Sequence, residues 1–110
     1  MLIHNKQTVP IDWNSIEKTE HKGEKGTAWW KTFEAGKVRM RIVEYSPGFV
    51  SDHWCPRGHV IHVLKGEMRI ELKDSTVHVL KAGMSVLLGN SEENPHLASS
   101  ETGTAFFIVD

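Results

Sequence analysis

The chain has 110 residues, of which 39% are hydrophobic and 25% are charged, and its net charge at neutral pH is −1. A chain of this length makes one domain, which buries roughly 60–70% of its unfolded surface and needs no disulfide to form a core. The charge gives no electrostatic footprint for nucleic acid or an anionic membrane. No apolar run approaches the ~20 residues needed to cross a bilayer, and the first residues lack the apolar core of a signal peptide.

Cys55 is the only cysteine, so an internal disulfide cannot form. A reducing compartment, and by default the cytoplasm, is therefore expected for this chain. The thiol of Cys55 is a buried filler, a reactive group or a metal ligand, and its isolation in the sequence leaves these three alternatives open.

Residues 1–26 are polar and weakly patterned. Asp12 is a candidate N-cap for a short helical turn that begins at Trp13. Residues 18–26 contain charged side chains and glycines and indicate a solvated loop. We expect residues 1–26 to form an N-terminal arm that packs Trp13 and Ile16 onto the main domain or onto a partner subunit.

From residue 27 onward the hydrophobic pattern has a period of two. Residues 27–33 are rich in strand formers, and residues 38–42 alternate apolar and basic side chains, as in a half-buried antiparallel strand. Further alternating segments follow, separated by turns that contain glycine, one of them expected at 65–67. About nine short strands and no convincing helix predict an all-β sandwich or barrel over residues 27–110.

Arg39 and Arg41 share one face of the strand at 38–42, and the apolar residues between and beside them share the other. We expect the basic face to be solvated or to lie at an interface. A carboxylate-binding pocket is the alternative interpretation.

The segment 48–66 holds three of the seven histidines and the only cysteine. His53 and Cys55 are two residues apart, so on an extended strand both side chains leave the same face. The turn at 56–58 can bring His59 back beside them. Three soft or borderline donors on two strands across a tight turn are typical of part of a metal site. A metal-free cavity lined by histidines is the alternative.

From about Gly48 to His96 the chain resembles the cupins, which are small double-stranded β-helix (jelly-roll) barrels. The segment His53-Trp54-Cys55 occupies the place of the family's His-x-His, and His59 occupies that of its glutamate, with six residues between it and the following glycine, Gly66. Residues 51–59 further resemble a small subgroup of cupins named for an Asp-His-Cys-Trp type signature, whose function is unassigned.

The second cupin motif is matched less completely. Residues 81–86 match its opening, and Asn94-Pro95-His96 matches its closing proline-histidine pair. The segment between them lacks the family's proline-glycine turn and is about two residues longer. The alternative to a place for His96 among the donors is that the longer loop carries it away from them.

Carried over position by position, the resemblance implies a ligand set of His53, Cys55, His59 and His96. Imidazole and thiolate suit a divalent transition metal and exclude Mg²⁺ and Ca²⁺. This set is softer than the usual site of three histidines and one glutamate, which favours zinc, with iron or nickel as alternatives.

The sequence assigns no catalytic residue and no organic cofactor, because we find no nucleophile–base pair, phosphate loop or pair of carboxylates. Asp52 and Arg57 flank the donors and are expected to orient them. One expectation is a cupin that holds a metal in its barrel and binds or transforms a small polar molecule. The alternative is a non-catalytic binding or sensor module with a structural metal or none. The resemblance also implies a homodimer.

Overall fold

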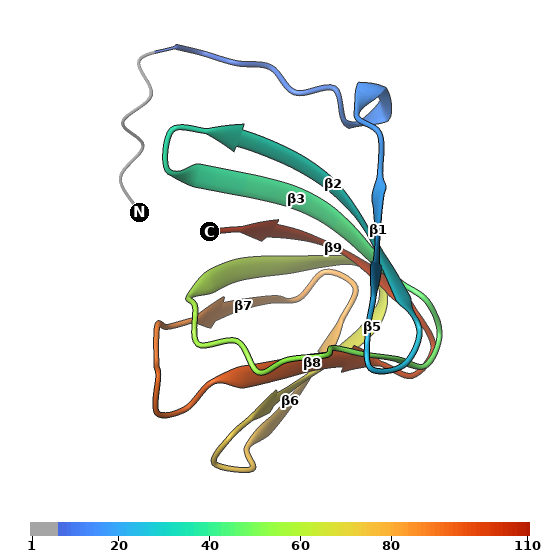
Figure 1. Ribbon diagram of the computed structural model, residues 1–110, viewed down its shortest axis with the longest axis vertical. Coiled ribbons are helices and arrows are strands. Elements are labelled where there is room, and N and C mark those ends of the chain that lie inside the picture. The colour runs from blue at the N-terminus through green and yellow to red at the C-terminus, as the bar shows by residue number, and fades with distance from the viewer. Residues whose placement is uncertain (1–6) are drawn as a thin grey trace.

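The computed structural model describes residues 7–110, and its regular secondary structure is almost entirely β-strand (Figure 1). After a short 3₁₀ helix, η1 (Trp13–Ser15), the strands are β1 (Thr19–Lys22), β2 (Thr27–Ala35), β3 (Val38–Tyr45), β4 (Phe49–Val50), β5 (His59–Leu72), β6 (Val77–Lys81), β7 (Ser85–Leu88), β8 (His96–Ser100) and β9 (Thr104–Val109). In the described residues, no helix has the length and apolar character needed to span a membrane.

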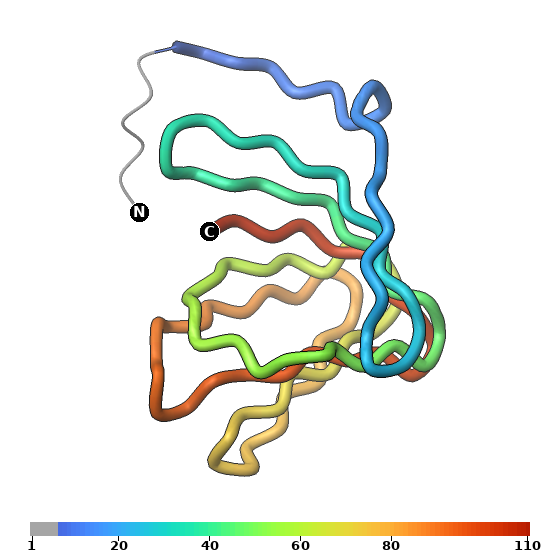
Figure 2. Tube along the Cα trace, in the orientation of Figure 1, coloured from blue at the N-terminus to red at the C-terminus, as the bar shows by residue number. Residues whose placement is uncertain are grey.

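The strands are hydrogen-bonded in the order β1-β2-β3-β9-β5-β8-β4, and β6 and β7 also pair with β5. Each of these pairings is antiparallel. Strand β5 pairs with β7 and β9 along its first half and with β6 and β8 along its second, so it links two halves of a curled sheet (Figure 2). The prediction of an all-β jelly-roll barrel is confirmed.

Strand β5 runs without interruption through residues 65–67, so the hairpin turn predicted there is wrong. The register of β5 against β9 shifts between Val63 and Lys65, which is a β-bulge. Gly66 follows with a φ of 76°, and a Cβ there would overlap the carbonyl oxygen of Gly103. The glycine therefore bends one long strand from the first half of the sheet into the second.

The N-terminal segment contributes a strand that its sequence does not signal. Asp12 caps η1 as predicted, because its side chain accepts a hydrogen bond from the Asn14 N–H at 3.1 Å. Trp13 meets Phe107 of β9 edge-on, with ring centroids 6.2 Å apart. The solvated loop predicted over 18–26 is wrong for β1, which pairs with β2 although most of its side chains are exposed. Residues 1–6 of the expected arm lie outside the described part of the chain.

The hydrophobic core lies on the concave side of the curled sheet. Because side chains alternate along each strand, every long strand places one of its two faces there. The buried apolar residues of the described chain are Ala28, Val43, Phe49, Ile61, Val63, Met68, Ile70, Leu80, Leu88, Phe106 and Ile108. The same inward-facing rows continue toward one end of the barrel, where polar residues replace apolar ones.

Candidate metal centre

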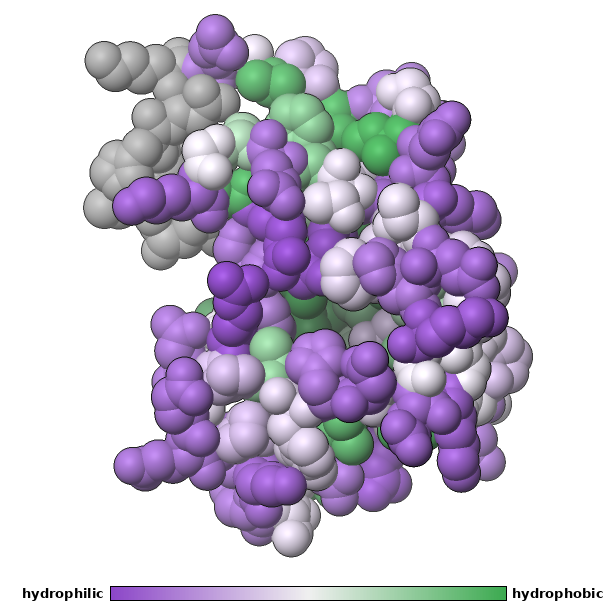
Figure 3. Space-filling model, in the orientation of Figure 1, coloured by the Kyte–Doolittle hydropathy of each residue, from purple (hydrophilic) through white to green (hydrophobic). Residues whose placement is uncertain are grey.

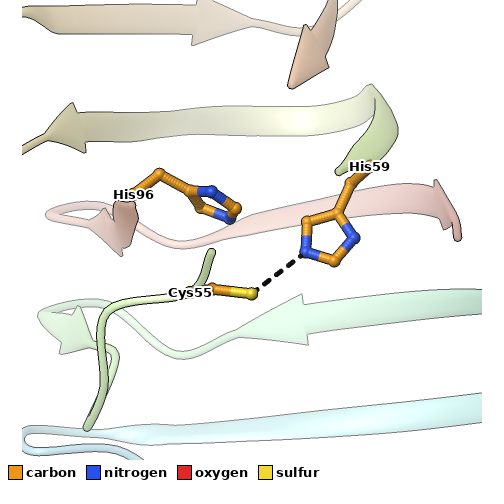
Figure 4. Close-up of side chains that lie close together, drawn as sticks. All are labelled: Cys55, His59 and His96. Carbon is orange, nitrogen blue, oxygen red and sulfur yellow. Dashed lines mark hydrogen bonds between the residues drawn. The ribbon is translucent and has the colours of Figure 1, made fainter. Parts of the chain in front are cut away.

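Three of the four expected ligands come together at the polar end of the barrel interior (Figure 4). The donor atoms of Cys55, His59 and His96 all lie within 4.8 Å of one another. Cys55 Sγ is 3.4 Å from His59 Nε2, and the two imidazole rings meet edge-on with centroids 5.2 Å apart. Both histidines are buried and Cys55 is half-buried, so the cluster is largely shielded from water.

The backbone holds these donors in place although residues 55 and 96 are far apart in sequence. His59 is the first residue of β5 and His96 the first of β8. Cys55 and His96 exchange two backbone hydrogen bonds, with N···O distances of 2.8 and 2.9 Å. The turn at 56–58 then returns the chain from Cys55 to His59, as predicted, and the Gly58 N–H donates to the side-chain oxygen of Asn90. The longer loop before His96 does not carry it away from the cluster.

His53 lies outside this group of donors. Its side chain is 68% exposed, and its Nδ1 is 2.7 Å from Asp52 Oδ1. The contact fits the expectation that Asp52 orients a ligand, and the bond to His53 lowers the pKa of the Asp52 carboxyl. Arg57 and His53 both line the cavity beside the cluster. The roles of His53 as a ligand and of Arg57 as an orienting group stay predictions.

Asp110 is part of the candidate site, and the sequence analysis did not identify it. Its Oδ2 is 3.2 Å from His59 Nδ1, although the contact lacks the alignment of a hydrogen bond. The Arg39 guanidinium donates to both carboxylate oxygens, at 3.0 and 2.8 Å, and Arg41 Nη2 is 3.6 Å from Oδ2. The only available signal is that Asp110 continues the inward-facing row of β9.

Burial sets the protonation of the two buried histidines. It lowers the pKa of His59 to about 4, against the opposing effect of the Asp110 carboxylate. Burial also lowers the pKa of His96, with a further contribution from His53. For Asp110, burial alone would raise the pKa, but the hydrogen bonds from Arg39 and the charge of Arg41 outweigh it and the pKa is lowered. At neutral pH both imidazoles are therefore uncharged, with lone pairs free to bind a metal, beside an ionised carboxylate.

The structure overturns the prediction that the basic face of β3 is solvated or lies at an interface. Arg41 is only 6% exposed, and its guanidinium carbon is 4.5 Å from the centroid of the Trp30 ring. Arg39 and Arg41 point to the same side as buried Val43, which is the concave side of the sheet. The alternation was identified correctly, but the buried face is the one that carries the arginines.

A cavity of about 320 Å³ adjoins the donors. Cys55, His59, His96 and Arg41 line it, together with apolar and aromatic side chains from the core. In Figure 3 hydrophobic residues are visible at the bottom of a recess between polar ones. The cavity thus combines an apolar wall with a few polar groups gathered at one end, as is typical of small-molecule sites.

The donor set fits a transition metal. Thiolate sulfur and imidazole nitrogen are ligands of zinc, iron, nickel and copper rather than of Mg²⁺ or Ca²⁺. The Nε2 atom of His59 faces Cys55, while its Nδ1 atom faces Asp110. Histidines that bind metals commonly have a carboxylate or carbonyl next to the other ring nitrogen, where it fixes the tautomer and the ring orientation. The described residues therefore offer three ligands and an orienting carboxylate.

Comparison with known proteins bears on the fold alone. No protein-family model matches the sequence, and no curated protein is significantly similar to it. Among solved structures, a predicted oxalate decarboxylase from Thermotoga maritima has a TM-score of 0.76 and 16% identity, over 92% of this chain and 96% of that one. An RmlC-like cupin from Shewanella frigidimarina has a TM-score of 0.69 and 18% identity, over 87% and 83%. The polyketide cyclase RemF from Streptomyces resistomycificus has a TM-score of 0.72 and 18% identity, over 94% and 78%.

These similarities show that the chain has the cupin fold. The fold predicted from the motifs around His53 and His96 is thereby confirmed. Activities differ among proteins that share a fold, so the function has to be argued from the site.

Proposed function

We propose that the protein binds one divalent transition metal through Cys55, His59 and His96 and that it binds or transforms a small polar molecule in the adjoining cavity. The observation that carries this proposal is the convergence of three donor atoms within 4.8 Å, on two buried residues and one half-buried residue beside a cavity. We propose zinc as the metal, because one sulfur and two or three imidazole nitrogens form a typical zinc donor set. Iron and nickel are the alternatives.

His53 decides between the two forms of this proposal. With three protein ligands, one position stays open for water or a substrate, as in catalytic zinc sites. With His53 as a fourth ligand the shell would be closed, as in structural sites, and the barrel would serve as a binding or sensor module. The 68% exposure of its side chain and its contact with Asp52 favour the open form. A metal in an open site would supply Lewis-acid chemistry or activate bound water.

The chain's own residues have separate tasks under this proposal. Asp110 holds the His59 ring so that Nε2 is the atom presented to the metal. Apolar residues of the cavity wall exclude water from one side of the site. Cys55 is a free thiol, and because a thiolate ligand requires reduced sulfur, we propose the cytoplasm as the compartment.

Elemental analysis of protein purified without a histidine tag tests the site. We expect about one metal per chain in the wild type and its loss in Cys55→Ser, His59→Ala and His96→Ala. His62→Ala is the matched control, because His62 lies on the same strand but pairs with Ser85 outside the cluster. Absence of bound metal even after reconstitution would overturn the proposal.

Cobalt substitution tests the sulfur ligand and His53. The cobalt-substituted protein should show a thiolate-to-cobalt charge-transfer band that Cys55→Ser abolishes. If the site is open, His53→Ala should leave the cobalt spectrum and stoichiometry unchanged. A changed spectrum in that variant would instead make His53 a fourth ligand and favour the structural form of the proposal.

We also propose a homodimer that forms through the outer face of β5 and β7. Leu87 is 80% exposed and lies opposite Val60, which is 40% exposed. Leu64 and Met84 are also exposed, at 49% and 45%. A second copy of the chain would remove these side chains from water.

A further inference from the structure

Arg41 is a buried cation whose hydrogen bonding is incomplete. Its side chain is 7% exposed, and its Nε has no hydrogen-bond partner among the described residues. Its contact with Asp110 is 3.6 Å, which is longer than a normal hydrogen bond. Both oxygens of that carboxylate already accept from Arg39. A buried guanidinium with an unpaired Nε–H is costly unless an acceptor is supplied from elsewhere.

The position of Arg41 shows where such an acceptor would come from. Arg41 lines the same cavity as the three metal-binding candidates. Arg41 and His59 both contact Asp110 Oδ2, so a single carboxylate oxygen lies between the guanidinium and an imidazole of the cluster. The Trp30 ring packs on the guanidinium at 4.5 Å and restricts its orientation. A ligand in the cavity would therefore meet the proposed metal and a fixed cation together.

The charge of the cavity wall has the sign that an anion requires. Among the lining residues, four are lysine or arginine and one is an acid: Lys22, Arg39, Arg41, Arg57 and Asp52. Asp110 adds a second negative charge behind the wall, but it is shared between the two arginines of β3. Lys22 is also paired with Glu20, at 2.9 Å. With His59 and His96 uncharged, the four cations still outnumber these three carboxylates.

The rest of the wall indicates the kind of anion. Aromatic and aliphatic side chains form the interior of the cavity, among them Trp30, Phe49, Ile61 and Phe106. These residues would bury the apolar body of a ligand, whereas the arginine offers a planar fork of donors that matches a carboxylate. A doubly charged phosphate would need more donors than one incompletely paired guanidinium provides.

We propose that Arg41 is the recognition residue for the carboxylate of a small, largely apolar carboxylic acid bound in the barrel cavity beside the metal. This assignment rests on the proposed function for its relation to the metal, but it does not require the metal for carboxylate binding. It names the substrate class that the proposed function leaves open.

Calorimetric titration with benzoate, phenylacetate and hexanoate tests the proposal, with the matching amides as uncharged controls and inorganic phosphate as a competing anion. We expect the carboxylates to bind wild-type protein at least about tenfold more tightly than the amides do. Arg41→Met should remove that preference, and Arg41→Lys should restore part of it. Arg69→Met is the control, because Arg69 is exposed on β5 and does not line this cavity.

A side-chain nitrogen NMR signal gives a readout that does not depend on a folded variant. The Arg41 Nε–H resonance of the wild type should shift when benzoate is added and should not shift with benzamide. Absence of carboxylate binding in metal-loaded wild-type protein would overturn the carboxylate site and leave the metal site intact. Carboxylate binding by a protein that takes up no metal would overturn the proposed function and support the Arg41 site. Phosphate binding as tight as that of benzoate would overturn the assignment to carboxylates.

Discussion

The two ends of the barrel interior are built by the same strands and differ in chemistry. At one end, β3, β5 and β9 place Val43, Val63 and Phe106 inward, and all three are buried. At the other end, the same inward rows present Arg41, His59 and Asp110. Alternation along a strand determines which face is inside, but it does not determine whether that face is apolar. The position at which an inward row changes from apolar to polar marks the candidate site.

Removal of a large side chain from the apolar end should produce the largest effect. Phe106 is 2% exposed and packs edge-on against Tyr45, with ring centroids 5.0 Å apart. We expect Phe106→Ala to lower the free energy of unfolding by about 3–5 kcal/mol, because it removes a buried aromatic ring and enlarges the cavity that Phe106 lines. Urea denaturation measures this change. Phe107→Ala is the matched control on the outer face, and an equal loss in that variant would contradict the distinction between the two faces.

Acidification of the metal-free protein should lower its stability, because the polar end of the barrel contains a buried, uncharged His59. The pKa of His59 is lowered from 6.5 to about 4, so between these values the unfolded chain binds a proton that the folded chain does not. The contribution of His59 to the free energy of unfolding is therefore fully present above pH 6.5. It falls by about 2–3 kcal/mol as the pH is lowered toward 4.

The pH dependence can be assigned to His59 by difference. Unfolding free energies of chelator-treated wild type and His59→Gln should converge as the pH falls from 6.5 to 4, because only the wild type has this proton uptake. His96 has a lowered pKa as well, and its contribution remains in both proteins. Parallel pH profiles would contradict the assignment.

Substitution of Asp110 should weaken metal binding without removing a ligand. Asp110→Asn loses the charge that faces His59 Nδ1, and changes in such supporting groups typically lower metal affinity by about 10–100-fold. Competition with a coloured chelator measures the change. Asp74→Asn is the control, since Asp74 is exposed and pairs with Asn94 away from the site. Equal affinity in the wild type and Asp110→Asn would show that the carboxylate does not support the metal.

Local patterns in the sequence predicted the strands and three members of the cluster. Period-two alternation identified β2 and β3, and the His53-Trp54-Cys55 and Pro95-His96 motifs indicated the cupin fold. The turn at 56–58 predicted that Cys55 and His59 would meet, and they do. These features depend on residues that are close in sequence or on a family pattern.

The remaining features depend on pairings between distant strands. Asp110 meets Arg39 and Arg41 because β9 lies beside β3, with Ile108 opposite Arg41, and no local signal gives that register. The buried face of β3 was assigned wrongly because arginines on a strand usually face water, whereas here Asp110 and Trp30 accommodate them. Strand β1 is absent from the sequence-based prediction because it lacks apolar alternation. It is held by its hydrogen bonds to β2, which leave no signal in its own sequence.

A substitution on the outer face of β5 and β7 should have the smallest effect on folding but a clear effect on assembly. Leu87 is 80% exposed in the single chain, so Leu87→Lys should change the free energy of unfolding of the monomer by no more than about 0.5 kcal/mol. A charge at the centre of the proposed interface should nevertheless convert the dimer to a monomer in sedimentation experiments, because it would be buried without a partner. Val79→Lys is the control, since Val79 is 45% exposed on β6, which pairs with the other half of β5. A monomeric wild type, or a dimer unaffected by Leu87→Lys, would show that this face does not mediate assembly and that its apolar side chains are tolerated in water.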